Sequence, residues 1–310
     1  MLERLLQFGI ILMMLAGLSG CGGADSNDAG TGQLSVGITD APIDSAEAVV
    51  IHFTSVTVHG DEGNIVSDVT DPDTGEGRSI DLLALQGGQW TGLFDEEIPS
   101  GHYSWIRLGI DLDLSYIQIA GEQHPLECNS CNNNGYKLVT SFNVEPDAVL
   151  ALMLDFDLRK SITQPSNELH RYILRPTVRV VQTEASGSIS GTVDGTLISE
   201  LGGVQGCSVY VFEAADATLD DIYIPLDSIP DTQNNPVSTA SVGYDDIDSV
   251  YRYKVSFLPA GVYSVALTCE AENDSADSDE VLNFCAPINE TVVAGATSIV
   301  DFIYQTCPPS

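Results

Sequence analysis

Residues 98–110 read IPSGHYSWIRLGI and residues 258–270 read LPAGVYSVALTCE, so the two stretches share a Pro-small-Gly-x-Tyr-Ser core. Pro and Gly favour a tight turn, and the residues after the Tyr follow an alternating strand pattern. A period of two is typical of a strand with one buried and one solvated face. Each stretch therefore predicts a turn leading into an antiparallel strand, and the repetition predicts two related sandwich domains.

The rest of the chain carries the same strand pattern on both sides of residue 185. Runs of β-branched and aromatic residues are separated by Gly, Pro, Asn and Asp, and no long amphipathic helix is indicated beyond the N-terminus. Before residue 185 the expected strands are 34–39, 48–59, 79–85, 103–114, 116–120, 136–144, 148–158 and 172–182. After residue 185 they are 187–193, 207–213, 238–243, 251–257, 262–270, 287–293 and 298–304. We predict an all-β chain with two immunoglobulin-like or prealbumin-like sandwiches in tandem, residues 33–185 and 186–310.

Two of these strands carry charges on the face expected to contact water. The charged residues are Asp155 and Asp157 in strand 148–158 with Arg159 directly after it, and Arg175 and Arg179 in strand 172–182 with Arg171 directly before it. Opposite charges on neighbouring strands stabilise a sheet by roughly 0.2–1 kcal/mol per pair. We therefore expect a solvated charge ladder here rather than the paired acids of a glycosidase.

The charge balance is strongly acidic, with 45 acidic and 11 basic residues and a net charge of −34. Such a surface repels nucleic acid and anionic headgroups, which excludes both as partners. It suits a hydrated, soluble surface or cation binding. Beyond residue 185 the only basic residues are Arg252 and Lys254, and this change in composition supports a boundary there.

The first 21 residues, MLERLLQFGIILMMLAGLSGC, predict an exported protein. The apolar run 5–18 is short for a membrane span of about 20 residues but suits a signal peptide. Its end, Leu18-Ser19-Gly20-Cys21, resembles the lipobox of bacterial lipoproteins, which implies cleavage before Cys21 and acylation of its thiol with palmitate or a similar chain. We expect a signal peptide at 1–20 and a lipidated cysteine with a flexible tether at 21–32.

The cysteine count agrees with export to an oxidising compartment. If one of the seven cysteines, Cys21, carries lipid, six remain, and six can pair completely. Cys128 and Cys131 form a C-x-x-C pair that could bind zinc with His124, but a fourth ligand is not evident. A covalent haem would need His at position 132, and a redox-active pair usually opens a helix. A disulfide between Cys128 and Cys131 is favoured.

The other four cysteines allow three pairings. Cys285 and Cys307 lie near the open end of a hairpin that turns around 294–296, which favours a bond between them. Cys207 opens one expected strand and Cys269 closes another, so antiparallel neighbours would bring these two together. Each bond would contribute about 2–4 kcal/mol to stability.

A family resemblance follows from six blocks in order: GQLSVGITDAPIDSAEAVVIHFTSVTVHG, IDLLALQGG, IPSGHYSWIRLGI, GYKLVTSF, LMLDFDLRKSI and YILRPTVRVV. Over about residues 33–182 the chain resembles a bacterial lipoprotein family that contains the domain of unknown function numbered 4382. The resemblance implies an exported, lipid-anchored, β-rich protein, and it brings no established activity. The segment LECNSCNNNGYKL departs from the family pattern, so its Cys pair is interpreted as a local addition.

Residues 187–305 resemble the carboxypeptidase-regulatory-like, or transthyretin-like, fold. The supporting segments are GSISGTV, GCSVYVFEA, YKVSFLPAGVYSVAL and SIVDFIY. This second resemblance implies a spacer or binding module rather than an enzyme.

The segment ITDAPID, residues 38–44, belongs to the N-terminal signature of the first family. We expect Asp40 to accept hydrogen bonds from the backbone of the following turn, and Pro42 to fix the path out of that turn. Both residues are therefore predicted to be structural.

The segment DVTDPDTGEG, residues 68–77, places Asp71, Asp73 and Glu76 in faint likeness to a calcium loop. The loop lacks the later bidentate Glu of an EF-hand, so an exposed turn is favoured and these three residues are weak calcium candidates. The acidic loops 244–248 and 272–280 are similar cases. No other cofactor is expected.

A search for catalytic motifs finds no G-x-S-x-G, H-E-x-x-H, P-loop or dinucleotide fingerprint, and the five histidines are scattered. We therefore predict a non-catalytic lipoprotein that binds or scaffolds at the outer membrane, anchored through Cys21, with an envelope protein or glycan as partner. The alternatives are a carbohydrate- or calcium-binding surface module and, less favoured, an unrecognised hydrolase.

Overall fold

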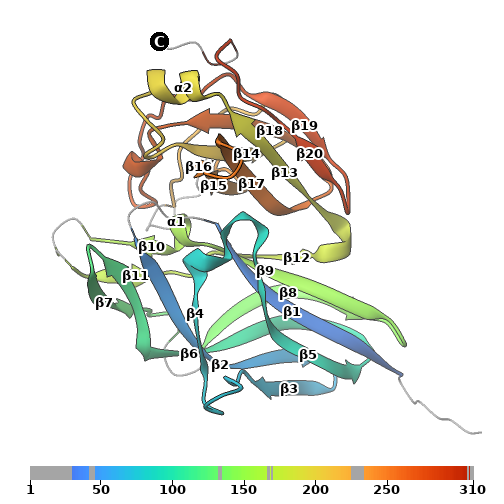
Figure 1. Ribbon diagram of the computed structural model, residues 1–310. Helices are drawn as coiled ribbons and strands as arrows, with labels where there is room; N and C mark the ends of the chain where they lie inside the picture. Colours follow the sequence, from blue (N-terminus) through green and yellow to red (C-terminus); the bar gives the residue numbers. More distant parts are fainter. Residues whose placement is uncertain are drawn as a thin grey trace, which may run out of the picture.

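The computed structural model describes residues 30–41, 46–131, 135–165, 168, 170–224, 234–305 and 307. The expected signal peptide, Cys21, most of the tether and Pro42 lie outside the described residues. The described strands form four sheets, two within residues 31–182 and two within residues 186–299. We call residues 30–185 the N-terminal region and residues 186–307 the C-terminal region. In Figure 1 the N-terminal region (blue to green) lies below the C-terminal region (yellow to red).

The N-terminal region is a sandwich of a smaller and a larger sheet. The smaller sheet has the order β12 (Val178–Gln182), β9 (Val149–Asp157), β1 (Thr31–Ala41), β5 (Thr91–Pro99). The path of the larger sheet is β10 (Ile162–Thr163), β11 (Tyr172–Leu174), β7 (Glu122–Glu127), β6 (Gly101–Ile119), β2 (Ala48–Gly60), β3 (Gly63–Asp68), with β4 (Arg78–Asp81) paired to β2 and β8 (Tyr136–Val144) paired to β6. Fully buried side chains such as Leu34, Phe53 and Phe156 fill the space between them.

The C-terminal region is a sandwich of two four-stranded sheets. One has the order β16 (Gly243–Asp245), β17 (Val250–Pro259), β13 (Ser186–Val193), β20 (Thr297–Ile299). The other has the order β15 (Ser238–Ser241), β14 (Ser208–Glu213), β18 (Gly261–Thr268), β19 (Ile288–Val292). Ile189, Val209 and Val265 lie in the core between them. The chain therefore has the all-β, sandwich-type fold that the alternating patterns predict.

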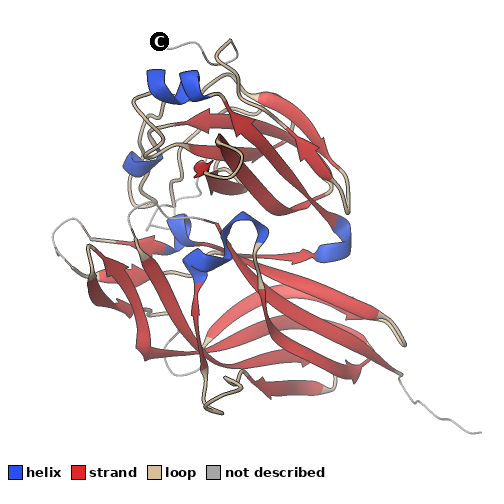
Figure 2. Cartoon of the chain, in the orientation of Figure 1, coloured by secondary structure: helices blue, strands red, loops and turns tan. Residues whose placement is uncertain are grey.

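The helices are few and short. They are α1 (Leu158–Ser161), α2 (Gly195–Glu200) and the 3-10 helices η1 (Leu82–Gly88), η2 (Thr183–Ala185) and η3 (Ala271–Asn273). Figure 2 shows that α1, η1 and η2 lie where the two regions meet. No helix among the described residues is long and apolar enough to span a bilayer.

The two regions share one strand arrangement. The first strand of each, β1 or β13, pairs antiparallel with the strand that ends at the repeated Pro, β5 or β17, and parallel with a later strand, β9 or β20. Within these pairs Thr31 lies opposite Pro99 and Ser186 opposite Pro259. The turn after each Pro leads to a strand of the opposite sheet, β6 or β18.

The repeated Tyr makes the same hydrogen bond in both regions. The hydroxyl of Tyr103 donates to the carbonyl of Pro99 at 2.8 Å, and the hydroxyl of Tyr263 donates to the carbonyl of Pro259 at 2.7 Å. The repeated sequence therefore encodes a corner in which the side chain at the start of one strand is bonded to the end of the strand before it.

Several element boundaries differ from the sequence prediction. The expected strand 79–85 ends at Asp81, whose carboxylate accepts a hydrogen bond from the N–H of Leu83 and starts η1. The expected strand 172–182 is divided into β11 and β12 around Pro176, because Pro has no N–H to donate to a neighbouring strand. The ranges 103–114 and 116–120 form one continuous strand, β6.

The alternation expected in β6 changes partway along the strand. Leu108 is buried as predicted, but Leu114 is 52% exposed while Ser115 and Ile117 are buried. The pairing of β6 with β2 shifts register between Val50 and His52, and such an irregularity changes which residues face the core.

The charged face of β9 is also not solvated. Asp155 and Asp157 of β9 and Arg159 of the following helix α1 are all buried, because this side of the N-terminal region lies against the C-terminal region. The prediction of a solvated charge ladder is wrong for these three residues. Its cross-strand pairing does occur at one position, where Arg179 on β12 lies opposite Asp155 on β9 and forms an ion pair with it.

Candidate functional site

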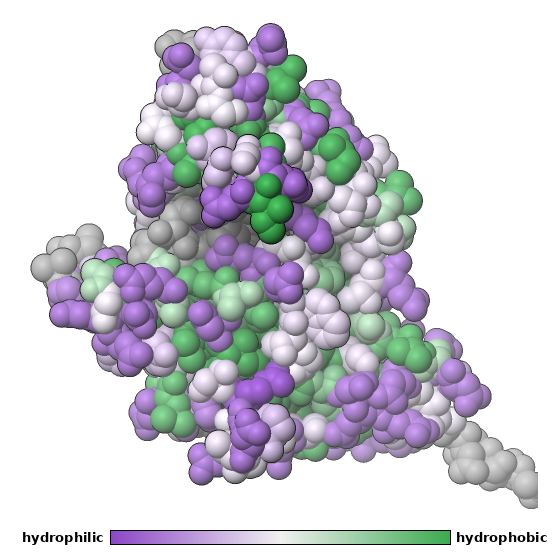
Figure 3. Space-filling view, viewed as in Figure 1, coloured by the Kyte–Doolittle hydropathy of each residue, from purple (hydrophilic) through white to green (hydrophobic). Residues whose placement is uncertain are grey.

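A cavity of about 880 Å³ lies between the two regions. Its N-terminal side is formed by the end of β1, by η1 and by Asp155 of β9, and its C-terminal side mainly by β13, β15, β16 and β17. Figure 3 shows that this face of the molecule is hollowed between the regions, with hydrophilic side chains around the hollow. The cavity therefore depends on residues that are far apart in the sequence.

The lining of the cavity is rich in hydroxyl groups. Seven Ser and Thr residues contribute to it: Thr39, Ser190, Thr192, Ser238, Thr239, Ser241 and Ser256. Arg252 and Lys254, the only basic residues beyond position 185, line it as well. The wall thus offers hydrogen-bond donors and acceptors, and it carries both acidic and basic side chains.

Some of these polar atoms are buried without a partner. They are both carboxylate oxygens of Asp40, Oγ1 of Thr239 and Oγ of Ser256. Buried polar atoms in folded proteins nearly always have a hydrogen-bond partner, so a group of orphaned atoms contributed from both sides of one cavity indicates a place for a polar ligand or for water.

Asp40 is the central residue of the site. It is the penultimate residue of β1 and is 6% exposed. The parallel register places it beside Phe156, between Asp155 and Asp157 on β9. Burial, and then the charges of these two aspartates, raise the pKa of Asp40 well above its usual range, which favours its neutral form.

The role expected for Asp40 stays a prediction, because the turn that follows β1, residues 42–45, lies outside the described residues. Both carboxylate oxygens of Asp40 are buried without a hydrogen bond of good geometry, and the nearby backbone N–H of Leu158 opposes the rise in the pKa of this carboxyl. The preceding residue makes a local contact of its own: Oγ1 of Thr39 donates to the carbonyls of Leu85 at 3.1 Å and Gln89 at 2.7 Å. Thr39 therefore holds η1 against β1, and Asp40 is left facing the cavity.

The helix η1 closes this side of the cavity by direct contact with β17. Gly88 has a φ of +87°, and a Cβ at this position would lie 2.4 Å from Oγ of Ser256 and 3.1 Å from Nζ of Lys254. A larger residue would not fit between the regions, and the left-handed conformation itself favours Gly.

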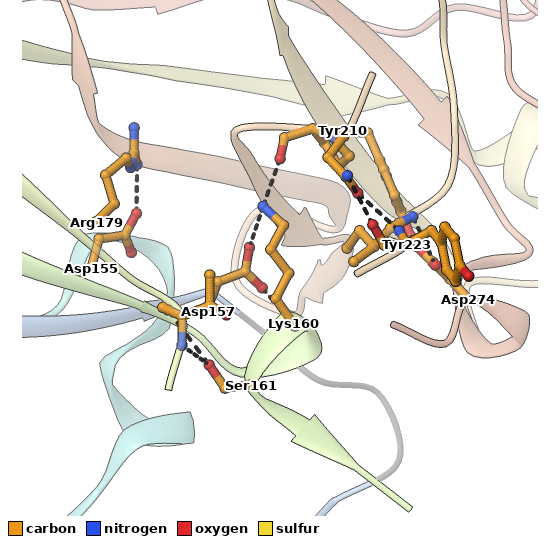
Figure 4. Close-up of polar contacts among 12 residues, drawn as sticks. Asp155, Asp157, Lys160, Ser161, Arg179, Tyr210, Tyr223 and Asp274 are labelled. Atoms are coloured by element: carbon orange, nitrogen blue, oxygen red, sulfur yellow. Dashed lines mark hydrogen bonds and ion pairs between the residues drawn. The ribbon is translucent and has the colours of Figure 1, made fainter. Parts of the chain in front are cut away.

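The two acids beside Asp40 have cations of their own. Asp155 pairs with Arg179, and Asp157 pairs with Lys160 at 2.8 Å, as Figure 4 shows. Burial raises the pKa of Asp155, and the Arg179 guanidinium opposes that rise. Lys160 also donates to the carbonyl of Pro236 at 2.6 Å, so it connects the two regions.

Arg159, in α1 just after β9, makes a second connection between the regions, which the alternating pattern alone does not indicate. Its guanidinium donates to Oη of Tyr210 at 2.7 Å, to the carbonyl of Ala271 at 3.1 Å and to Oγ of Ser208 at 3.2 Å. Tyr210 in turn donates to Oδ2 of Asp274 at 2.5 Å. A buried Arg from the N-terminal region is thus bonded to the core of the C-terminal region.

The weak calcium candidates lie elsewhere, in an exposed turn. Oδ1 of Asp71 accepts hydrogen bonds from the N–H groups of Asp73 at 2.9 Å and Thr74 at 3.0 Å, and these bonds lower the pKa of Asp71. Asp71 is therefore used to form the turn, and Glu76 contributes its backbone, bonding to the N–H of Asp71. Within the described residues a different set, Asp221, Asp274 and Glu280, brings three carboxylates together.

The six described cysteines form three disulfide bonds. The pairs are Cys128–Cys131, Cys207–Cys269 and Cys285–Cys307, the same pairs that the strand ends and the spacing favour. The sulfur atoms of Cys128 and Cys131 are bonded to each other, so this structure does not present them as thiolate ligands for zinc.

Comparison with known families assigns the first part of the chain. Residues 31–176 match the model of DUF4382, a domain of unknown function. The match runs from β1 to just before β12 and includes Asp40 and Asp155, whereas the C-terminal region lies beyond it. No curated protein matches the sequence.

Solved structures with similarity to the chain are distant. A leucine-rich repeat protein of Bacteroides thetaiotaomicron VPI-5482 is 14% identical, with a TM-score of 0.22; the alignment covers 88% of this chain but only 26% of that one. The Bacillus anthracis TIE protein is 11% identical, with a TM-score of 0.20, and 88% of this chain aligns with 33% of it. A minor pilin of Streptococcus agalactiae is 10% identical, with a TM-score of 0.20 and coverage of 87% and 94%.

Proposed function

We propose that this chain is a lipid-anchored cell-envelope protein that catalyses no reaction and binds an uncharged, hydroxyl-rich ligand of the carbohydrate class between its two regions. The observation that carries the proposal is Asp40, a buried carboxyl with two unpartnered oxygens on the wall of an 880 Å³ cavity.

The chemistry of the wall supports a ligand that both donates and accepts hydrogen bonds. A carboxyl group can accept bonds from two neighbouring sugar hydroxyls, or donate one when it is protonated. Thr239 and Ser256 add unpartnered hydroxyls, and Lys254 adds a cationic donor on the opposite side from Asp40. An uncharged ligand also avoids repulsion by a chain of net charge −34.

The size and aromatic content of the cavity agree with this class. Ligand sites commonly have volumes of about 300–1,000 Å³, which admits more than a single sugar ring. Tyr244 lines the wall and is half exposed, whereas Tyr253 is buried with its ring in the core of the C-terminal region and its Oη donating to the carbonyl of Val300 at 2.7 Å. An exposed aromatic face such as that of Tyr244 can pack against the apolar face of a sugar ring.

The location follows from the N-terminal sequence. The lipobox that ends at Cys21 supports an anchor in the outer membrane, and residues 22–30 would join that anchor to β1. Two acyl chains hold a protein at a bilayer far better than one, since each buried methylene contributes about 0.8 kcal/mol.

A glycan array probed with the full-length protein in detergent tests the binding proposal. We expect binding to a small set of neutral glycans, lost in Asp40→Ala and retained in Asp71→Ala, a matched change in an exposed turn. An array without neutral hits, or hits that Asp40→Ala leaves unchanged, would contradict the proposal.

Metabolic labelling with a palmitate analogue tests the anchor separately. We expect incorporation in the wild-type chain and none in Cys21→Ser. Incorporation that survives the substitution would place the lipid elsewhere.

A further inference from the structure

A group of three carboxylates lies in the C-terminal region, away from the cavity described above. Asp221 follows β14, whereas Asp274 and Glu280 follow η3, and each offers one oxygen within 4.8 Å of the others. Calcium binds oxygen at about 2.3–2.6 Å, so two of its ligands on opposite sides lie about 5 Å apart. The spacing of the three oxygens therefore fits one shared calcium ion.

One member of the group is fully buried. Asp221 is 0% exposed, and its Oδ1 has no hydrogen-bond partner. Its other oxygen, Oδ2, accepts a bond from the N–H of Glu280, so the carboxylate is directed toward the segment that carries the other two acids. A buried carboxylate oxygen without a partner is strongly disfavoured unless a cation or a donor reaches it.

The other two carboxylates are positioned by neutral donors. Asp274 accepts bonds from the N–H of Ile222 at 3.0 Å and from Tyr210. Glu280 accepts bonds from the N–H of Ser275 at 3.2 Å and from the Ser278 hydroxyl. Within the described part of the chain none of the three carboxylates forms an ion pair, although each is held in place.

One member of the group also lines a cavity between the regions. A second cavity, of about 430 Å³, is lined by Asp274, Ser275 and Glu272 on the C-terminal side and by Arg159 and Tyr172 on the N-terminal side. Asp274 therefore belongs both to the carboxylate group and to the wall of an open space between the regions.

We propose that Asp221, Asp274 and Glu280 bind one calcium ion. Three hard carboxylate oxygens suit calcium better than a softer metal. The ion satisfies Oδ1 of Asp221 and joins the 221 segment to the 274–280 segment. Because Asp274 is also bonded to Tyr210, which Arg159 contacts, a bound ion stabilises the C-terminal side of the junction between the regions.

Calorimetric titration of the full-length protein with calcium chloride, after removal of metal with EDTA, tests the assignment. We expect binding that Asp221→Asn weakens by about tenfold or more, together with loss of the calcium-induced rise in Tm. Asp71→Asn is the matched control, since it removes an acid from the exposed turn, and it should leave both readouts unchanged.

A second variant guards against misfolding of the buried one. Glu280→Gln changes a partly exposed ligand, so the fold should survive, and circular dichroism checks that it does. We expect the same loss of calcium affinity. Absence of calcium binding by the wild-type chain, or affinity that Glu280→Gln leaves intact, overturns the site, and a site that takes magnesium in preference to calcium overturns the choice of ion.

Discussion

The buried carboxyl group of Asp40, which we propose binds the ligand, lowers the stability of the folded protein. Its pKa is raised in the folded state above its ordinary value of 3.8, chiefly by burial. The folded state therefore holds the proton more tightly than the unfolded chain does. The stability that comes from the neutral form is complete below about pH 4 and is lost as pH rises through the raised pKa.

The substitution Asp40→Asn tests this sign. Without ligand, the free energy of unfolding should rise by about 1–3 kcal/mol at pH 8, because folding no longer has to bury a charge or take up a proton at this position, and the gain should vanish near pH 4. Urea unfolding at the two pH values measures it.

Asp71→Asn provides a control of opposite sign. The pKa of Asp71 is lowered by the turn N–H groups, so its contribution is present above its ordinary pKa and is lost as pH falls. The variant should be less stable than wild type at pH 8. A fall in stability for Asp40→Asn at pH 8 would show that the ionised carboxylate has a partner.

The two corner tyrosines, Tyr103 and Tyr263, are expected to contribute about equally to stability. Tyr103→Phe and Tyr263→Phe each remove one hydroxyl-to-carbonyl bond of nearly equal length. Each should lower the free energy of unfolding by about 0.5–1.5 kcal/mol, measured by urea denaturation. A large loss in one region and none in the other would mean that the two corners are not equivalent.

Among the elements, β9 and the helix after it show where sequence patterns succeed and fail. The strand itself could be predicted, because Leu152, Leu154 and Phe156 recur with a period of two. The burial of the opposite side could not be predicted, because charged residues such as Asp155 and Arg159 are normally solvated. Only contact with the C-terminal region removes them from solvent. The cavity could not be predicted for the same reason: Asp40 and Ser256 come to line one cavity only through tertiary packing.

Other elements could likewise be predicted only where their own residues mark them. The bounds of β8, residues 136–144, could be predicted correctly because a Gly precedes the strand and a Pro follows it closely. β3 and β7 carry mostly polar residues, so no apolar alternation marks them, and their pairing with β2 and β6 defines them instead. The short helix α2 is similarly local, started by the side chain of Asp194 rather than by an amphipathic pattern.

The contact of α1 with the C-terminal region leads to a prediction about Arg159. Arg159→Lys keeps the charge but loses the planar group that reaches Tyr210, Ala271 and Ser208. We expect a lower Tm and faster proteolysis near residues 182–186. Arg171→Lys is the control, because Arg171 forms exposed ion pairs with Glu127 and Glu168 worth about 0–1 kcal/mol. Equal behaviour of the two variants would show that the junction does not depend on Arg159.

On the scale of the whole molecule, the net charge of −34 produces self-repulsion that salt screens. Tm should therefore rise as sodium chloride increases from about 0.01 to 0.15 M, where the Debye length falls from about 30 to 8 Å. Differential scanning calorimetry measures the rise. The experiment is best done with EDTA present, so that contaminating calcium does not contribute, and a Tm that is independent of salt would show that the acids are already compensated.

The position of the cavity along β1 has a consequence for reach. The chain enters β1 at Thr31, and Asp40 lies nine residues further on, which at about 3.3 Å per residue separates them by roughly 30 Å. The tether between Cys21 and Thr31, about ten residues long, extends at most about 35 Å. With the proposed anchor at Cys21, the tether and the length of β1 together would let the cavity lie tens of ångströms from the bilayer, at the end of β1 far from the tether.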